Sequence, residues 1–203
     1  MSSVESHPER NVLRVQLRQN TVLSEIGDQA RADLEQRLTV VDCAKGDFLL
    51  HQGVFEMEQY FVLGGILKRV VANQQAHEMI LRFADERDME TSYAAWRLGT
   101  PTPYSIVCVT KARVAKLPLH QWVEFMEQHP SLKATFEMAV MRLMSEIMAH
   151  TITLHLLDAP GRVNRFMRKH PELFDRIPKK ELAAYLNLSA ETLSRLKQRG
   201  KIG

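Results

Sequence analysis

The segment KELAAYLNLSAETLSRLKQR, residues 180–199, indicates how the C-terminal part of the chain folds. Its leucines recur at spacings that suit the buried faces of two short helices, with the small Ala183 on the first of them. These leucines are Leu182, Leu186, Leu188, Leu193 and Leu196. Two helices that pack their apolar faces together across a tight turn form a helix-turn-helix motif. Ser189 is placed to cap the second helix, and Glu191 in its first turn suits the helix dipole.

The exposed face of that second helix carries side chains of the kinds that read base edges and contact phosphates. The expected DNA-binding residues are Ser189, Glu191, Thr192, Ser194, Arg195, Gln198 and Arg199. A solvated helical face with no binding role is the alternative interpretation. We expect the motif to bind double-stranded DNA.

Positive charge is concentrated in the same part of the chain. Residues 159–203 contain eleven Lys and Arg residues and four acidic residues, a net charge of +7. Because the whole chain carries +3, the preceding residues carry −4. A phosphate backbone requires such a local positive field, whereas a surface that only confers solubility mixes the two signs. The charge distribution therefore supports nucleic-acid binding independently of the motif.

The composition fits a chain with a proper core and two domains, since 45% of its 203 residues are hydrophobic. No apolar run approaches the roughly 20 residues of a membrane span, and the first residues lack a signal-peptide core. We therefore expect a cytoplasmic protein with no membrane partner. Cys43 and Cys108 show no CxxC spacing, so we expect buried core cysteines and neither a disulfide framework nor an iron–sulfur cluster.

The N-terminal two-thirds has a different pattern. After a helical opening that runs to about Leu38, short apolar or alternating runs follow one another, separated by turn signals such as Lys45-Gly46-Asp47 and Gly64-Gly65. These runs are residues 39–43, 48–51, 60–63, 66–71, 79–83, 104–109 and 113–117. Short strands at this spacing predict an antiparallel sandwich or barrel.

Three motifs precede the helix-turn-helix in a fixed order: Lys45-Gly46-Asp47, then Gln52-Gly53, then YFVLGGILK at residues 60–68. In this order they resemble the cyclic-nucleotide-binding β-roll and C-terminal helix-turn-helix of the Crp/Fnr family of bacterial transcription regulators. The resemblance implies an α+β fold, with a jelly-roll-like antiparallel β-roll sensor at residues 1–130, a long dimerisation helix at 131–158 and a helix-turn-helix domain at 159–203. It also implies a homodimer without enzymatic activity, RNA polymerase as a partner and an unidentified small-molecule effector.

Family members continue past the second helix into a two-stranded wing, whereas Gly200-Lys201-Ile202-Gly203 stands where the wing would begin. We therefore expect a truncated or absent wing. Its loss removes phosphate contacts, which position a protein on DNA and do not specify the sequence.

Residues 131–157 predict one long helix with a seam of residues, all apolar except one histidine, at alternating spacings of four and three. They are Phe136, Val140, Leu143, Ile147, His150, Leu154 and Leu157, and we expect this seam to pair with a second copy of the helix. Four flanking methionines, Met138, Met141, Met144 and Met148, are expected to pack back onto the β-roll. For His150, a polar seam residue and a pH or metal switch both remain open. Asp158-Ala159-Pro160-Gly161 is expected to break the helix.

The effector motif departs from the family members that bind cyclic AMP. Those members pair a Gly-Glu with an Arg-Ser or Arg-Thr about ten residues later, and the arginine neutralises the cyclic phosphate. This chain has Met89-Glu90 and no arginine between Leu98 and Ala112, so we do not expect cyclic AMP to bind. The expected effector pocket, with no ligand assigned and no metal or cofactor, is lined by Glu90, Tyr93, Trp96, Arg97 and Tyr104.

The Glu-x-x-Ser-Arg pattern from Glu191 to Arg195 resembles the fumarate and nitrate reduction regulator branch of the family. The resemblance implies that Arg195 contacts guanine, Glu191 accepts from a cytosine amino group and Ser194 contacts a neighbouring base, on a palindrome with TTGA-like half-sites. The alternative is that Arg195 contacts phosphate only. An alternative function is a β-roll dimer whose C-terminal module mediates protein interaction. An enzyme is not expected, because the strands supply no clustered His or Glu ligands.

Overall fold

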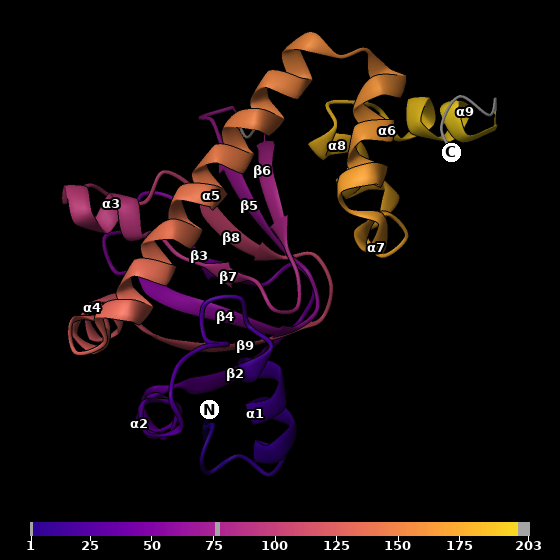
Figure 1. Cartoon of the computed structure of the whole chain (residues 1–203). Coiled ribbons are helices and arrows are strands. Elements are labelled where there is room, and N and C mark those ends of the chain that lie inside the picture. Colours follow the sequence, from indigo (N-terminus) through magenta and orange to yellow (C-terminus); the bar gives the residue numbers. More distant parts are fainter. Residues whose placement is uncertain (1, 76–77, 199–203) are drawn as a thin grey trace.

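The computed structural model describes residues 2–75 and 78–198, and its centre is a sandwich of two sheets (Figure 1). One sheet has the order β1 (Ser2–Ser3), β2 (Thr39–Cys43), β9 (Ala112–Pro118), β4 (Glu58–Gly64), β7 (Met89–Glu90). The other has the order β3 (Phe48–Leu50), β8 (Ser105–Cys108), β5 (Leu67–Ala72), β6 (Glu78–Ala84). Neighbouring strands are antiparallel in both sheets.

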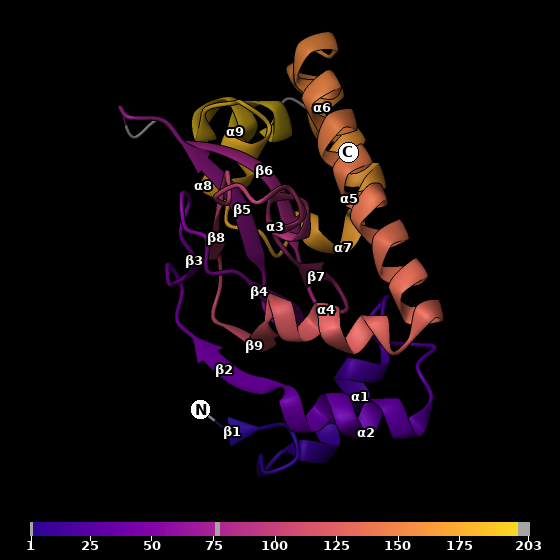
Figure 2. The same cartoon turned by 90° about the vertical axis from the view of Figure 1, so that its left-hand side faces the viewer.

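Helices cover the sandwich on several sides. They are α1 (Arg10–Arg18), α2 (Asp28–Arg37), α3 (Tyr93–Leu98), α4 (Leu119–Glu127), α5 (Pro130–Leu156), α6 (Ala159–Lys169), α7 (Pro171–Phe174), α8 (Lys179–Tyr185) and α9 (Ala190–Gln198). The N-terminal helices α1 and α2 lie at the opposite end of the molecule from α8 and α9, and α5 runs between the two ends (Figures 1 and 2). An antiparallel β-roll followed by a long helix and further helices is the fold class that the sequence predicts.

The predicted strands are confirmed as β2 to β6, β8 and β9, within a residue or two at each end. The run Tyr60–Leu63 is apolar throughout because both faces of β4 are buried. Tyr60 and Val62 point into the space between the sheets, while Phe61 and Leu63 point to the helices on the outer face. The strands β1 and β7 were not predicted, because two residues are too few for an alternating pattern.

The tight turn between β4 and β5 requires glycine at Gly65. Its φ is +85°, and a Cβ built on it would lie 2.3 Å from the carbonyl oxygen of Lys111. A side chain at this position would therefore be strained by both the backbone conformation and the contact.

Three apolar clusters hold the molecule together. One lies between the two sheets, around Val62, Ile106 and Val114, and includes the buried free thiols of Cys43 and Cys108, as the sequence predicts. A second joins the outer face of the β4 sheet to the N-terminal helices, α4 and the start of α5. The third joins the outer face of the β5–β6 sheet to α6, α7, α8 and α9. The C-terminal helices are therefore packed onto the β-roll.

The predicted break after the long helix is confirmed. Leu157 is extended, with ψ of 145°, and the Asp158 side chain accepts a hydrogen bond of 2.9 Å from the backbone N–H of Gly161. Pro160 and Gly161 lie in the first turn of α6, where a missing N–H costs no hydrogen bond. The segment thus ends one helix and caps the next.

Most residues of the predicted dimer seam on α5 face the interior of the protomer. Phe136 is fully buried and packs edge-on against Trp122, with ring centroids 5.4 Å apart, and Leu143 is 6% exposed. Val140 packs against the same core, and His150 stacks on Tyr185. Of the other members, Ile147 and Leu154 are half-buried and Leu157 is 38% exposed. A side chain already enclosed in its own chain is not available to a second copy.

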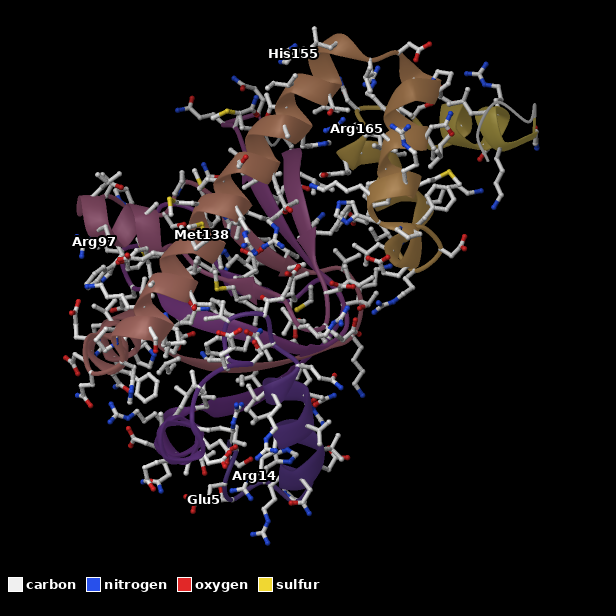
Figure 3. All side chains as sticks on the ribbon, viewed as in Figure 1. Glu5, Arg14, Arg97, Met138, His155 and Arg165 are labelled. Atoms are coloured by element: carbon white, nitrogen blue, oxygen red, sulfur yellow. The ribbon has the colours of Figure 1, made fainter. Side chains whose placement is uncertain are left out.

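The methionines lie on the opposite, exposed face, which reverses the predicted packing onto the β-roll. Met138, Met141, Met144 and Met148 are 49%, 57%, 49% and 65% exposed, and Ile152 and Leu156 continue the same face at 51% and 77%. At about 100° per residue, the six side chains fall within roughly a third of the helix circumference. We call these six residues the methionine stripe; Met138 near its start is labelled in Figure 3.

Within residues 2–75 and 78–198, no helix is both long enough and apolar enough to cross a bilayer. Arg199 and the residues 200–203, on which the wing prediction rests, lie outside the described residues.

Candidate nucleic-acid interface and effector site

The turn between α8 and α9 fixes the angle between the two helices. Asn187 has a φ of +52°, a conformation that Asn tolerates better than most residues, and it ends α8. The N–H of Leu188 then donates to the carbonyl of Ala183 at 2.8 Å. The predicted cap is confirmed, since the backbone N–H of Thr192 donates to the Ser189 hydroxyl at 3.1 Å.

The outer face of α9 presents charged and polar side chains to solvent. Glu191, Arg195 and Gln198 are exposed, while Leu193 anchors the helix in the apolar cluster below. Ser194 and Thr192 are half-buried and bonded within the helix. The Ser194 hydroxyl donates to the carbonyl of Ala190 at 2.9 Å, and Arg195 donates to the Thr192 hydroxyl at 3.4 Å. Among the described residues, Glu191 and Arg195 are therefore the long charged side chains on this face, and the hydrogen bond of Arg195 stays within α9.

The helix α8 is fixed to the β-roll by apolar and charged contacts. Tyr185 packs on Phe83 of β6, with ring centroids 5.1 Å apart. The Lys68 ammonium donates to Glu181 at 2.8 Å, and the Arg176 guanidinium makes two hydrogen bonds of 2.7 Å to the Glu86 carboxylate. These contacts hold α9 in place with its charged face directed away from the sandwich.

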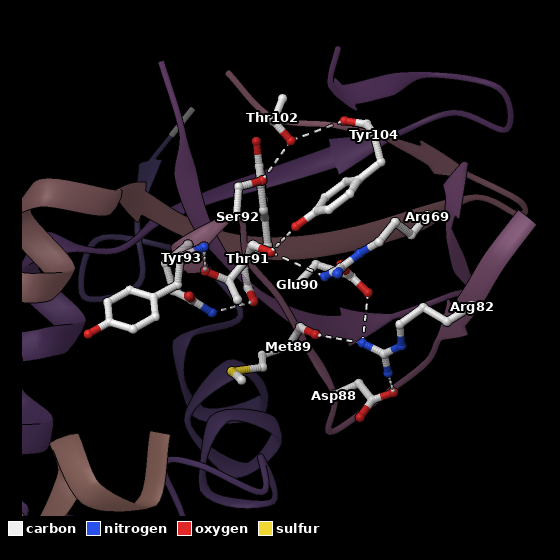
Figure 4. Close-up of polar contacts among 12 residues, drawn as sticks. Arg69, Arg82, Asp88, Met89, Glu90, Thr91, Ser92, Tyr93, Thr102 and Tyr104 are labelled. Atoms are coloured by element: carbon white, nitrogen blue, oxygen red, sulfur yellow. Dashed lines mark hydrogen bonds and ion pairs between the residues drawn. The ribbon is translucent and has the colours of Figure 1, made fainter. Parts of the chain in front are cut away.

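The predicted effector site is occupied by the protein's own side chains (Figure 4). The Glu90 carboxylate is fully buried and accepts hydrogen bonds from Arg69 of β5 at 3.0 Å and from Arg82 of β6 at 2.7 Å. Arg82 also donates to Asp88 at 2.8 Å, and the Arg69 guanidinium lies 4.1 Å above the Tyr104 ring. Burial raises the pKa of Asp88, although the adjacent Arg82 opposes this shift. The acidic residue expected to hold an effector is thus already neutralised.

Hydroxyl groups close the other side of this site. The Tyr104 hydroxyl donates to the carbonyl of Thr91 at 2.6 Å, and the Ser92 and Thr102 hydroxyls are hydrogen bonded to each other at 3.0 Å. Burial raises the pKa of Tyr104. Thr102 and Tyr104 come from the segment where family members that bind cyclic AMP carry the phosphate arginine.

Three of the predicted pocket residues lie elsewhere. Arg97 is exposed on α3, with its guanidinium 5.9 Å from the centroid of the Tyr93 ring, so it does not reach into the Glu90 site. Trp96 is half-buried, and its ring also stacks on the Tyr93 ring. Tyr93 itself is buried, donates to Glu137 of α5 at 3.0 Å and packs edge-on against Phe136. Of the predicted residues, Glu90 and Tyr104 therefore share one site, and Tyr93, Trp96 and Arg97 lie outside it.

Arg69 and Arg82, which complete that site, are not among the residues predicted from the sequence. The signal for Arg69 was present, because Lys68 and Arg69 are consecutive in a strand and their side chains must point to opposite faces. Lys68 points to Glu181 on the outside, and Arg69 points inward, where it is 2% exposed.

Comparisons with known proteins agree with this geometry. Residues 40–129 match the family model of the cyclic nucleotide-binding domain. This part of the chain has the cyclic nucleotide-binding fold. No curated protein sequence matches the chain.

Solved structures of three bacterial proteins are similar over most of the chain. FixK2 from Bradyrhizobium japonicum has a TM-score of 0.68 at 16% identity, covering 80% of this chain and 86% of its own. The c-di-GMP responsive global regulator CLP from Xanthomonas campestris has 0.69 at 13%, covering 86% and 92%. A mutant of CooA from Carboxydothermus hydrogenoformans has 0.69 at 14%, covering 90% and 84%. At these identities the likeness extends the shared fold beyond the β-roll to the long helix and the C-terminal helices.

Proposed function

We propose that the protein is a homodimeric transcription regulator of the Crp/Fnr type that binds DNA sequence-specifically through α9. The observation that carries the proposal is the exposed Glu191 and Arg195 on a capped helix that α8 holds against the β-roll. The net charge of +7 over residues 159–203 supplies the attraction to phosphates. The protein-interaction alternative has no comparable observation in its favour.

The two charged side chains suit base readout in the major groove. Arginine pairs with the O6 and N7 of guanine through two parallel hydrogen bonds, and glutamate accepts from the amino group of cytosine. Arg195 and Glu191 are one helical turn apart on α9 and so address neighbouring base pairs. The proposed half-site is TTGA-like, with Arg195 at its guanine.

Arg195→Ala is expected to lower affinity for a TTGA palindrome by about 1–3 kcal/mol and to relax the preference at one base pair. Lys197→Ala is the matched control, since Lys197 is exposed on the same helix. It should weaken all sequences alike and flatten the salt dependence by about one unit. Binding is measured by fluorescence anisotropy on the palindrome and on a version with its guanine replaced, at several salt concentrations.

Equal losses on both DNA sequences for Arg195→Ala would make Arg195 a phosphate contact and remove the basis of the half-site. If neither DNA binds more tightly than a random duplex, DNA recognition itself is refuted, and the protein-interaction alternative takes its place.

We infer that the two copies meet through the methionine stripe of α5. Exposed apolar surface of this extent marks an interaction site, and a second copy of the same helix offers the same stripe over the same length. The stripe spans residues 138–156, about 27 Å along the helix axis. A two-fold dimer formed this way requires a two-fold operator.

Cyclic AMP is not the effector in this proposal, because Glu90 is already paired with Arg69 and Arg82. A ligand that binds only the folded state stabilises it by about 2.7 kcal/mol at a hundredfold excess over its Kd. We therefore expect the thermal unfolding midpoint to stay unchanged in micromolar cyclic AMP. Differential scanning calorimetry with and without the nucleotide makes the measurement, and a clear rise in the midpoint would show that the nucleotide displaces the internal ion pairs.

A further inference from the structure

A cavity of about 230 Å³ lies where β6, α5 and α6 meet, away from the Glu90 site. Its walls include Phe83 from β6, His150 from α5 and Phe166 from α6. Arg82 and Asp88 line the cavity, and Arg82 also donates to Glu90 at 2.7 Å. The cavity therefore borders the β-roll, the long helix and the C-terminal helices at once.

The α6 wall of the cavity carries hydrogen-bond donors whose capacity is not used. Arg162, Arg165 and Lys169 lie on one face of the helix, at spacings of three and four residues. Arg165 makes no hydrogen bond or ion pair with any residue that the structure describes, and it lies on the side of α6 that faces α5 (Figure 3). Lys169 has one weak partner, Glu146 at 3.5 Å.

Arg162 adds a buried donor to the same wall. Its Nη1 donates to the carbonyl of Leu186 at 2.8 Å, which holds the guanidinium in place. Its Nε is buried and has no partner among the described residues. A buried donor without an acceptor is unfavourable, and a ligand acceptor would remove that cost.

Four carboxylates also line the cavity, and two of them have arginine partners. Asp88 pairs with Arg82 at 2.8 Å, and Asp85 lies 3.5 Å from Arg176. Burial, together with the neighbouring carboxylates, raises the pKa of Asp85 to about 6, so this group carries less than a full charge near neutrality. Glu172 is exposed to solvent. The groups left without partners in the cavity are chiefly donors on α6.

We propose that this cavity binds a small organic anion, whose phosphate or carboxylate group is held by Arg162, Arg165 and Lys169. Guanidinium and ammonium groups bind such anions by charge-assisted hydrogen bonds. Phe83, Phe166 and the stacked rings of His150 and Tyr185, 3.7 Å apart, offer apolar surface to the organic part. The bound anion ties α6 to the surrounding β6 and α5. Any effect on the position of α9, and so on DNA affinity, rests on the proposed function.

The test uses the full chain without DNA, with pyrophosphate as the phosphate probe and citrate as the carboxylate probe. Calorimetric titration at physiological salt should detect binding of at least one, and the double variant Arg165→Gln, Lys169→Gln should weaken that binding at least about tenfold. The matched control is Arg168→Gln, because Arg168 is exposed on α6 and does not line the cavity. It should bind the probe as the unaltered protein does. Whichever probe binds names the acidic group that the ligand carries.

Three results would overturn the proposal. One is the absence of binding by either probe at millimolar concentration. Another is an equal loss in the double variant and in Arg168→Gln, which indicates a diffuse basic surface. The third is an unchanged probe affinity in the double variant, with a loss of DNA affinity instead, which assigns these side chains to DNA phosphates. Since the titration contains no DNA, its outcome is separate from that of the Arg195→Ala measurement.

Discussion

Glu90→Gln is expected to lower the free energy of unfolding by about 3–5 kcal/mol, because it leaves two guanidinium groups in the core without their shared counter-charge. Glu90 is fully buried, and the side chains of Arg69 and Arg82 are 2% and 12% exposed. Their loss of hydration is compensated by the carboxylates of Glu90 and Asp88, by backbone carbonyls and, for Arg69, by the Tyr104 ring. Urea unfolding of both proteins, fitted to a two-state transition, gives the difference.

Asp42→Asn is the control, since it removes a carboxylate from an ion pair of similar length at the surface. Asp42 accepts from Arg113 at 2.7 Å, but the two side chains are 51% and 29% exposed. Its loss should therefore change stability by no more than about 1 kcal/mol. The double variant Arg69→Met, Glu90→Leu should be more stable than Glu90→Gln, because it removes one of the uncompensated charges. If Glu90→Gln costs no more than Asp42→Asn, the buried network is not what closes this site.

The elements of the β-roll were predictable because their signals are local. A strand such as β4 can be predicted from a few residues, because an apolar run is followed by a turn in which Gly65 has positive φ. The cap at Ser189 and the break at Asp158 are likewise set by residues close in sequence. Each of these predictions needs only the chain within one helical turn or one strand.

The ion pairs that occupy the predicted effector site could not be predicted in the same way. Glu90 meets Arg69 across 21 residues of sequence, and the strand that carries Glu90 has only two residues. Strand alternation indicates that either Lys68 or Arg69 points inward. It indicates neither which of the two does so nor which buried residue it contacts. No arginine lies between residues 98 and 112, and the arginines that pair with Glu90 come from β5 and β6.

The long helix illustrates a different limit. The apolar series that contains Phe136 and Leu143 has spacings of three and four residues. The series of methionines that contains Met141 and Met148 has the same spacings. Periodicity identifies two apolar faces of α5, but the side on which the β-roll lies decides which face it covers. The aromatic cluster of Trp122, Tyr93 and Phe136 takes the larger side chains inside. The unbranched, adaptable methionines occupy the exposed face of α5.

The double variant Met141→Glu, Met148→Glu is therefore expected to convert a dimer to monomers with little change in the fold of each chain. Both side chains are more than half exposed within one chain, at 57% and 65%, so glutamate is tolerated there in the monomer. In a two-fold pair the stripes face each other, and four carboxylates would enter an apolar interface without partners. Sedimentation velocity at micromolar concentration measures the mass.

Two further variants separate this interface from ordinary surface and core effects. Leu98→Glu changes a residue that is 76% exposed on α3, outside the stripe, and should leave the dimer mass unchanged. Leu143→Ala removes a buried side chain from the predicted seam that faces inward. It should cost about 2–5 kcal/mol of stability while the folded protein remains a dimer. A dimer that survives Met141→Glu, Met148→Glu but dissociates in Leu143→Ala would require the copies to meet through the inner face of α5, with the β-roll displaced from it.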